Sequence, residues 1–269
     1  MSYNFDDIFG ALPYGFCPFS LVKARLIPCR AMARLPENAQ TVIVVLFPYY
    51  LGEDYYRDSN VSMYAVPADY HIIAGGLLQA AAEQLKARYP AYAFVPFCDN
   101  SPIPEVPTAS CAGLGDKGVN GLLINHTYGS FCFIGEIVTD LSIPCQARMP
   151  SPCLQCGKCG NACPAGVLGG DGFNKGKCLS HISQQKKDLS AEEREMLTSA
   201  GCAWGCDICQ KVCPMNRNIQ PSPIRAFYET AKPRFIAGDS VEGRAFAWRG
   251  EKVINRNIGL LDASKGNKL

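Results

Sequence analysis

Eight of the fifteen cysteines follow a spacing that constrains the fold more than any other feature of the chain. The first run is Cys153-x2-Cys156-x2-Cys159-x3-Cys163-Pro164, the second is Cys206-x2-Cys209-x3-Cys213-Pro214, and Cys178 lies between them. Gaps of two residues let a tight turn bring successive sulfurs to one centre, while the fourth thiolate comes from elsewhere. The pattern predicts a housing for two 4Fe-4S clusters.

The spacing also predicts which cysteines share a cluster. In the bacterial pattern the last cysteine of a run serves the other cluster, because the chain has turned away after the third ligand. One cluster is therefore assigned to Cys153, Cys156, Cys159 and Cys213, and the other to Cys163, Cys206, Cys209 and a further ligand. Cys178 is the favoured candidate. Cys202 is the rival, but it follows an expected helix end and can be a buried free thiol.

A disulfide framework and a pair of zinc sites are the alternative interpretations of these cysteines. A chain of 269 residues does not need disulfide staples, and residues 1–10 lack the basic cluster of a secretion signal. Zinc ribbons pair two C-x2-C hooks and do not use the longer run. We therefore expect a reducing, cytoplasmic setting. The longest apolar stretch, residues 41–50, is strand-sized, so no membrane span is expected.

Charge is distributed unevenly along the chain. Residues 1–148 hold 9 Lys and Arg against 13 Asp and Glu, whereas residues 149–269 hold 17 against 11. Two oxidised cubanes with four thiolates each carry about −2 apiece, which offsets most of the basic excess. The charge balance therefore permits a nucleic-acid partner without requiring one. The sequence also lacks a dinucleotide fingerprint and a phosphate loop.

Strand and helix patterns alternate before the first cysteine run. Residues 41–47 form a continuous β-branched run, which predicts a central strand buried on both faces. A helix capped by Asp69 is expected at residues 69–88. Its apolar stripe comprises Ile72, Ile73, Leu77, Leu78, Ala81 and Leu85. A second strand is expected at 92–97, and a hairpin from residues 121–125 and 130–137.

Later residues give weaker signals. Ser190 and Glu193 have the spacing of a capping box, and Gly201 is expected to end that helix. Beyond residue 220, scattered prolines and charges indicate a tail without a recognisable pattern. These observations divide the chain into residues 1–148, 149–220 and 221–269.

An ordered series of motifs between residues 30 and 218 resembles the epoxyqueuosine reductase family. The family's Asp-Tyr-His helix start is found at 69–71, and its Asp-x-x-Pro-x-x-Glu turn at 99–105. Its Gly-Leu-Gly loop, Leu-Leu-Ile-Asn strand, Tyr-Gly-Ser turn and Gly-Glu-Ile strand are found at 113–115, 122–125, 128–130 and 135–137. Its Cys-x-Ser and Gly-Cys-Asp elements match 178–180 and 205–207.

The resemblance implies an α+β protein related to cobalamin-dependent reductive dehalogenases. A nitroreductase-like α/β N-terminal domain would hold cobalamin beside a bacterial-ferredoxin-like double 4Fe-4S domain. Electrons from a low-potential donor such as ferredoxin or flavodoxin would pass through the clusters to the cobalamin, which in the family reduces an epoxide on a modified tRNA base. Asp99 matches the proton-donating acid, a role that requires a raised pKa. The matching cofactor-binding positions are Gly113, Gly115, Asn125, Tyr128, Ser130 and Ser183.

Departures from the family pattern keep a second interpretation open. The loop that usually reads Gly-Leu-Gly-Trp-Ile-Gly-Lys-Asn has Asp116 in place of the aromatic residue and Val119 in place of the lysine. Many members also carry a C-terminal helical-repeat module that grips tRNA, which residues 1–269 do not include. The alternative is a cobalamin-free 4Fe-4S electron-transfer protein on the same scaffold. The histidines His71, His126 and His181 are expected to be structural or surface groups.

Overall fold

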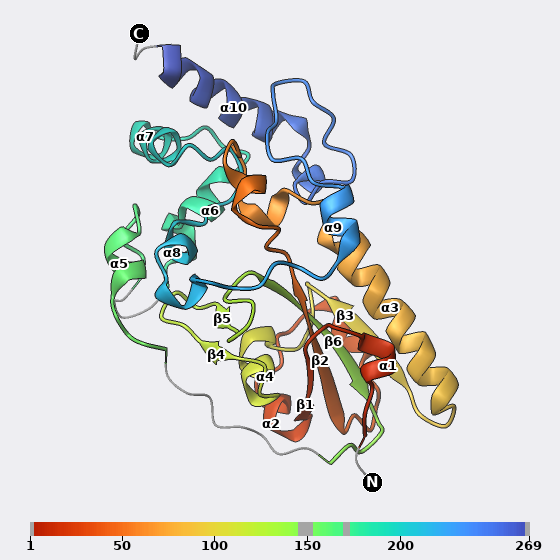
Figure 1. Cartoon of the computed structure of the whole chain (residues 1–269). Coiled ribbons are helices and arrows are strands. Elements are labelled where there is room, and N and C mark those ends of the chain that lie inside the picture. Colours follow the sequence, from red (N-terminus) through yellow and green to blue (C-terminus); the bar gives the residue numbers. More distant parts are fainter. Residues whose placement is uncertain (1–2, 145–152, 169–172, 267–269) are drawn as a thin grey trace.

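A four-stranded antiparallel sheet forms the centre of the computed structural model, which describes residues 3–144, 153–168 and 173–266 (Figure 1). The strand order is β1 (Tyr14–Pro18), β2 (Thr41–Pro48), β6 (Cys132–Thr139) and β3 (Phe94–Cys98). In the register, Glu136 of β6 lies between Val44 of β2 and Phe97 of β3. Every residue of β2 is buried, which confirms the predicted central strand.

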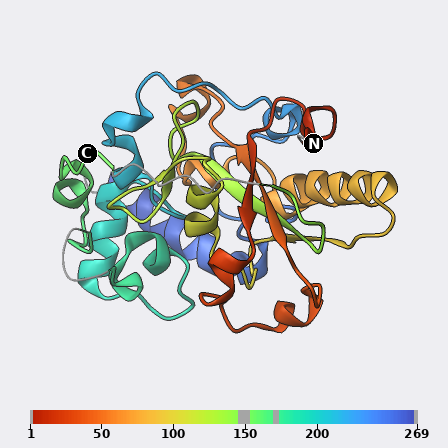
Figure 2. The same ribbon diagram turned by 90° about the horizontal axis from the view of Figure 1, so that it is seen from below.

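The two faces of the sheet are covered by different helices. Helix α3 (Tyr70–Arg88), with α1 (Asp6–Phe9), covers one face, and α4 (Glu105–Cys111) covers the other (Figures 1 and 2). Asp69 caps α3, because its carboxylate accepts from the His71 N–H at 3.0 Å, as predicted. The predicted apolar stripe is partly wrong, since Ile72 and Leu77 are 62% and 44% exposed.

A separate pair of short strands replaces the predicted hairpin. Strand β5 (Leu123–Ile124) pairs with β4 (Asp116–Lys117), and an isolated bridge joins Asn125 to Gly129. Residues 121–125 do not pair with β6, because β2 and β3 already occupy both edges of that strand. The hairpin prediction is therefore wrong. The strand expected at 92–97 is present as β3, shifted toward the C-terminus.

Short helices make up the cysteine-rich segment. They are α5 (Lys158–Ala162), α6 (Leu179–Ser183), α7 (Ala191–Ala200) and α8 (Ile208–Lys211). The Ser190–Glu193 capping box is present at the start of α7, and Gly201 ends that helix with φ +65°, as predicted. The predicted domain boundary between residues 148 and 149 lies outside the described residues. The remaining short elements are α2 (Ser20–Lys23) and 3-10 turns at Arg30–Arg34, Glu53–Tyr56, Met63–Ala65, Lys175–Lys177, Pro214–Asn216 and Ala247–Arg249.

The segment predicted as a tail is an integral part of the fold. It contains α9 (Arg225–Glu229) and α10 (Glu251–Gly266), and three of its phenylalanines, Phe227, Phe235 and Phe246, are almost completely buried. The apolar pattern was missed because these residues lie in loops and short helices without a regular period. In the described part of the chain, no helix is long and apolar enough to cross a bilayer.

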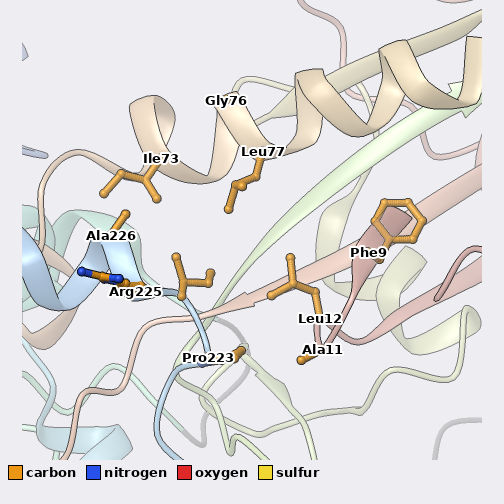
Figure 3. A pocket seen from close by; sticks show the side chains of 10 residues that line it. Phe9, Ala11, Leu12, Ile73, Gly76, Leu77, Pro223, Arg225 and Ala226 are labelled. Carbon is orange, nitrogen blue, oxygen red and sulfur yellow. The ribbon is translucent and has the colours of Figure 1, made fainter. Parts of the chain in front are cut away.

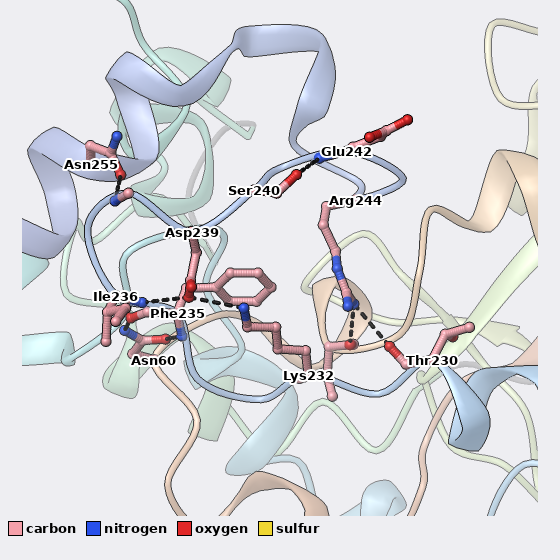
Figure 4. A network of polar contacts seen from close by, with 12 residues as sticks. Asn60, Thr230, Lys232, Phe235, Ile236, Asp239, Ser240, Glu242, Arg244 and Asn255 are labelled. Carbon is pink, nitrogen blue, oxygen red and sulfur yellow. Dashed lines mark hydrogen bonds and ion pairs between the residues drawn. The ribbon is translucent and has the colours of Figure 1, made fainter.

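The loop between α9 and α10 is fastened to the segment that precedes α3 (Figure 4). Asn60 exchanges two hydrogen bonds with the Phe235 backbone, at 2.8 and 2.9 Å. The Arg244 guanidinium donates to the carbonyls of Val66 and Thr230, at 3.1 and 2.9 Å. The Asp69 N–H donates to the Gly243 carbonyl at 2.8 Å. We call the bonds of this set that join residues 230–244 to residues 59–69 the C-terminal clamp.

Candidate redox and proton-transfer site

The four thiols assigned to the first cluster lie together. Cys153, Cys156, Cys159 and Cys213 line one small cavity, which residues 118–120 border on another side. Burial raises the pKa of the Cys213 thiol, and the three other thiols raise it further because they interact with it electrostatically. The packing of α5 against α8 brings the two runs together.

The second predicted group is also brought together. Burial raises the pKa of Cys206 to about 11 and that of Cys209 to about 12, and the thiols of Cys163 and Cys178 contribute to both shifts. Cys202 also interacts with Cys206, but its buried thiol donates to the Trp204 carbonyl at 3.1 Å. Such thiols are protonated at neutral pH, so iron binding must supply the free energy for their deprotonation.

Each predicted group holds four thiols, which is the number that a cubane needs. Among the described residues, no three His, Cys, Asp or Glu side chains converge tightly enough to hold one metal ion. In a cubane, each thiolate binds a different iron at a different corner, so the four sulfurs surround a larger centre. The arrangement of two groups of four thiols fits that requirement.

Side chains next to the cysteines connect the cluster segment to the sheet. Gln210 donates from Nε2 to the Ser130 carbonyl at 3.0 Å and to the Tyr49 hydroxyl at 3.3 Å. Asn216 accepts from the Ser130 N–H at 2.7 Å. The buried Asp207 carboxylate accepts from the Met63 N–H at 2.8 Å and from the Ser62 hydroxyl. The clusters would therefore sit in a fixed position relative to β2, β6 and residues 59–69.

Most of the predicted cofactor-binding side chains already have partners within the protein. Asn125 donates to the Leu114 carbonyl at 2.7 Å and accepts from the Thr127 and Tyr128 N–H groups. Ser183 donates to the Ser180 carbonyl and accepts from the Gly205 N–H, and it is fully buried. Ser130 and Tyr128 are 4% and 8% exposed.

The two predicted glycines serve the loop itself. Gly113 has φ +78°, which glycine adopts without strain. A Cβ on Gly115 would collide with the Ile124 carbonyl, so this position brings the loop close to β5. The six predicted cofactor contacts therefore do not form one open surface, and their role in cofactor binding stays a prediction.

An acid–base cluster lies at the start of α3. The Tyr70 hydroxyl donates to Asp99 Oδ2 at 2.8 Å, and His71 Nε2 lies 3.4 Å from the same oxygen. The other ring nitrogen of His71 lies 2.8 Å from Asp69 Oδ1. Asp99 and Asn100 follow β3 with φ values of +56° and +44°, an uncommon conformation that is often found at functional sites.

The charges of this cluster differ from the sequence-based expectation. The hydrogen bond from His71 lowers the pKa of Asp99 well below its usual range, and the Asn100 N–H and Tyr70 hydroxyl lower it further. The same bond raises the pKa of His71 to about 9, with a smaller contribution from Asp69. At neutral pH the pair therefore holds one proton, which is on His71. The raised pKa expected of Asp99 is therefore not present in this conformation. His71 was expected to be a structural or surface group, but it is paired with Asp99.

The His71–Asp99 pair predicts a direct NMR result. The His71 imidazole should titrate near pH 9, and Asp99→Asn should move this midpoint toward the ordinary value of about 6.5 because it removes the paired charge. Signals from His126 and His181, which lie elsewhere, are internal controls. A His71 midpoint near 6.5 in the unmodified protein would show that the pair is not formed.

The His71–Asp99 pair should also make a pH-dependent contribution to the free energy of unfolding. A raised pKa on His71 stabilises the fold below the ordinary histidine pKa, and this contribution disappears as the pH rises through about 9. A lowered pKa on Asp99 stabilises the fold above the ordinary aspartate pKa, and this contribution disappears in acid. Both contributions are present together between roughly pH 4 and 6.5.

An apolar groove of about 560 Å³ lies on another side of α3 (Figure 3). Phe9, Leu12, Ile73, Leu77 and Pro223 line it, and Arg225 is the charged residue at its edge. None of Tyr70, His71 and Asp99 lines this groove. The groove is therefore separate from the acid–base cluster.

Two family models match the chain. The model described as "Epoxyqueuosine reductase QueG, DUF1730" matches residues 30–100, and "4Fe-4S double cluster binding domain" matches residues 152–216. The chain is 32% identical over 246 residues to the epoxyqueuosine reductase of Lactococcus garvieae, covering 82% of this chain and 68% of the relative. It is 33% identical over 245 residues to that of Escherichia coli K12, covering 91% and 60%.

The chain is 33% identical to the epoxyqueuosine reductase of Pseudomonas aeruginosa, covering 87% of this chain and 62% of the relative. It therefore spans about two thirds of the length of these relatives. The epoxyqueuosine reductase structure from Streptococcus thermophilus has a TM-score of 0.75 at 24% identity, covering 97% of this chain and 79% of that one. An epoxyqueuosine reductase solved with an epoxyqueuosine-modified tRNA-Tyr stem loop has a TM-score of 0.77 at 21% identity, covering 96% and 78%. At these identities the structures show a shared fold.

Proposed function

Because the chain belongs to the epoxyqueuosine reductase family, we propose that it is an oxidoreductase that delivers electrons through two 4Fe-4S clusters to an epoxide-type substrate. The observation that carries this proposal is the presence of two groups of four thiols. Asp207, next to Cys206, accepts a hydrogen bond from Met63, in the segment that leads to the start of α3. The acid–base cluster of Asp69, Tyr70, His71 and Asp99 begins at that point. Electron delivery and proton supply would then meet in one small region.

We further propose the ligand sets of the two clusters. Cys153, Cys156, Cys159 and Cys213 would hold one, and Cys163, Cys178, Cys206 and Cys209 the other. The electrostatic interactions among the thiols within each set support this division. The hydrogen bond from the Cys202 thiol to the Trp204 carbonyl favours Cys178 over Cys202 as the eighth ligand.

Cobalamin is the second proposed cofactor. The described cavities beside the cysteines, of about 20 and 50 Å³, are too small for a corrin ring. The His71 and Asp99 side chains are 43% and 51% exposed, so a large ligand could reach the acid–base cluster from solvent. When bound, cobalamin would supply a strongly reducing, nucleophilic cobalt. The residues of this chain would hold the proton and keep the substrate oriented.

The proposed substrate is an epoxide carried on tRNA. One relative of the same fold was solved with an epoxyqueuosine-modified tRNA stem loop, and the basic excess of residues 149–269 is compatible with RNA binding. In the Bacillus subtilis enzyme, a catalytic aspartate loop has been seen swung out of the active site. The positive φ values of Asp99 and Asn100 are compatible with a similar movement in this chain. A low-potential ferredoxin or flavodoxin is the proposed electron donor.

Anaerobic reconstitution with iron and sulfide, followed by cobalamin titration, tests this function. We expect about eight irons per chain, stoichiometric binding with the cobalt EPR signal of base-off Co(II), and reduction of an epoxyqueuosine-containing stem loop by a low-potential donor. Protein that has not been reconstituted with iron and sulfide is the control for electron delivery. About eight irons without cobalamin binding would contradict the reductase and favour the electron-transfer alternative.

A further inference from the structure

A buried polar network fastens the second cysteine run to the sheet. Gln210 lies between Cys209 and Cys213 and is 6% exposed. Its Nε2 lies 3.0 Å from the Ser130 carbonyl, 3.1 Å from the Ser130 hydroxyl and 3.3 Å from the Tyr49 hydroxyl. Ser130 is itself 4% exposed. Such a network holds one arrangement, because any other would leave buried polar groups without partners.

Asn216 closes the same turn and joins it to Ser130 a second time. Its Nδ2 donates to the Gln210 carbonyl at 2.8 Å and to the Ser130 hydroxyl at 2.9 Å. Its Oδ1 accepts from the Ser130 N–H at 2.7 Å. The Gln210 carbonyl also accepts from the Cys213 N–H at 3.1 Å. One asparagine side chain therefore holds the cysteine turn together and attaches it to the residues before β6.

A glycine in the sheet makes room for this attachment. Gly129 has φ +59°, and a Cβ at this position would overlap Oδ1 of Asn216. The next residue, Ser130, offers its N–H, its carbonyl and its hydroxyl to the cluster segment. The Tyr-Gly-Ser motif therefore serves the attachment of the cysteine turn, since its glycine admits Asn216 and its serine binds it.

The network continues to the acid–base cluster through three packed rings. The Tyr49 ring lies 4.5 Å from the Phe133 ring, measured between centroids. The Phe133 ring lies 4.3 Å from that of Tyr70, with the two planes 12° apart. The Tyr70 hydroxyl donates to Asp99 Oδ2 at 2.8 Å. Direct contacts therefore join Gln210 to Asp99, and they transmit position without any ring gaining or losing an electron.

Electron delivery depends on where the clusters lie, because the rate of electron transfer decreases steeply with distance. In the proposed ligand sets, Cys209 and Cys213 belong to different clusters, so the turn between them carries one ligand of each. Hydrogen-bonded groups next to metal ligands fix where those ligands point. A shift of this turn on Ser130 would therefore move ligands of both clusters relative to the sheet and to Asp99.

We propose that Gln210 and Asn216 are positioning residues for electron delivery. They hold the turn between Cys209 and Cys213 on Ser130, and so fix both clusters relative to the acid–base cluster. This proposal rests on the proposed reductase function and on its ligand sets. Neither side chain binds iron or exchanges an electron, because each acts through the cysteines beside it.

The EPR spectrum of the reduced, cluster-loaded protein tests the position without cobalamin. Two reduced clusters interact magnetically, and the interaction depends on their distance and relative orientation. Gln210→Met and Asn216→Leu nearly preserve side-chain volume but lose the hydrogen bonds, so both should change the interaction signal while keeping about eight irons per chain. Gln79→Met, at an exposed position on α3, is the matched control and should leave the signal unchanged. An unchanged signal in both variants would overturn the proposal.

A milder variant keeps the test decisive if these two proteins lose their clusters. Ser130→Ala removes the hydroxyl that both amides contact, and it leaves the backbone N–H and carbonyl of residue 130 in place. It should keep its iron and change the magnetic signal in part. A signal identical to that of the unmodified protein would then overturn the proposal.

Rapid mixing with dithionite, followed by cobalamin, tests electron delivery itself. In Gln210→Met the clusters should be reduced at the unmodified rate and cobalamin binding should not change. Electron transfer from the clusters to the cobalt should be about tenfold to a hundredfold slower. An unmodified transfer rate beside an altered magnetic signal would overturn the role in delivery while leaving the reductase intact. Failure of the unmodified protein to bind cobalamin would contradict the reductase, and the magnetic signal would still decide whether Gln210 positions the clusters.

Discussion

Cys209→Ala is expected to leave the purified, reconstituted protein with about four irons per chain in place of about eight. Cys209 belongs to the second thiol group, and a cubane that has lost one thiolate is exposed to solvent and labile. Because the ligands organise the loops around them, the variant should also unfold at a lower temperature. Iron and sulfide analysis, the visible charge-transfer absorption and thermal unfolding under anaerobic conditions measure these effects.

Four matched variants make the cysteine experiment specific. Cys156→Ala should remove the other cluster and give a similar iron content. Cys111→Ala, on α4 and outside both thiol groups, should keep about eight irons. Cys178→Ala should lose a cluster and Cys202→Ala should not, which decides the eighth ligand. Full iron content in both Cys156→Ala and Cys209→Ala would contradict the two-cluster assignment.

Asp99→Asn is expected to lower the rate of epoxide reduction by at least about a hundredfold, with cobalamin binding and iron content unchanged. Asparagine nearly preserves the shape of the side chain, but it removes the negative charge that keeps the proton on His71. It also cannot receive and release a proton between substrate and protein. Single-turnover reduction over a range of pH values measures the loss.

Asp116→Asn is the matched control for this experiment. Asp116 lies on β4, where His126 Nε2 is 4.0 Å from Oδ2, so the variant removes an aspartate near a histidine at a different site. Its rate should stay close to that of the unmodified protein. An Asp99→Asn variant that reduces the epoxide at the unmodified rate would show that the carboxylate has no part in the chemistry.

Features that depend on neighbouring residues could be predicted from the sequence. The β-branched run of β2 gives a strand buried on both faces, and the Asp69 cap and the Ser190 capping box mark where α3 and α7 begin. The cysteine spacing predicts two groups of thiols because the ligands of a cubane are largely local in the chain. For the two helix caps the physical cause lies within about one turn of the residue concerned, and for the cysteines most ligands of a cluster lie within one run, although each cluster also takes a ligand from the other run.

Features that depend on distant residues could not be predicted. The hairpin expected from residues 121–137 does not form, since strands far away in the sequence pair with β6. His71 carries no local sign of its raised pKa, because the causative Asp99 is supplied by a different strand end. Glu136 is a polar residue within a strand, and it is buried because residues distant in the sequence, among them Phe19, Ile103 and Ala109, pack on that face of the sheet. The Asp-Tyr-His and Gly-Glu-Ile motifs mark both positions without giving the reason.

The C-terminal clamp has a consequence for the order in which the protein matures during synthesis. Asn60 and Phe235, which it joins, are 175 residues apart, so the ribosome releases the Asp69–His71 helix start long before the residues that hold it in place. A nascent chain can form β2 and α3 early, but it lacks the bonds from Arg244 and Gly243 until much later. The bond between Asp69, a partner of His71, and Gly243 is therefore made only after both cysteine runs have emerged, and interrupted synthesis yields chains that contain all eight predicted cluster ligands but lack this bond.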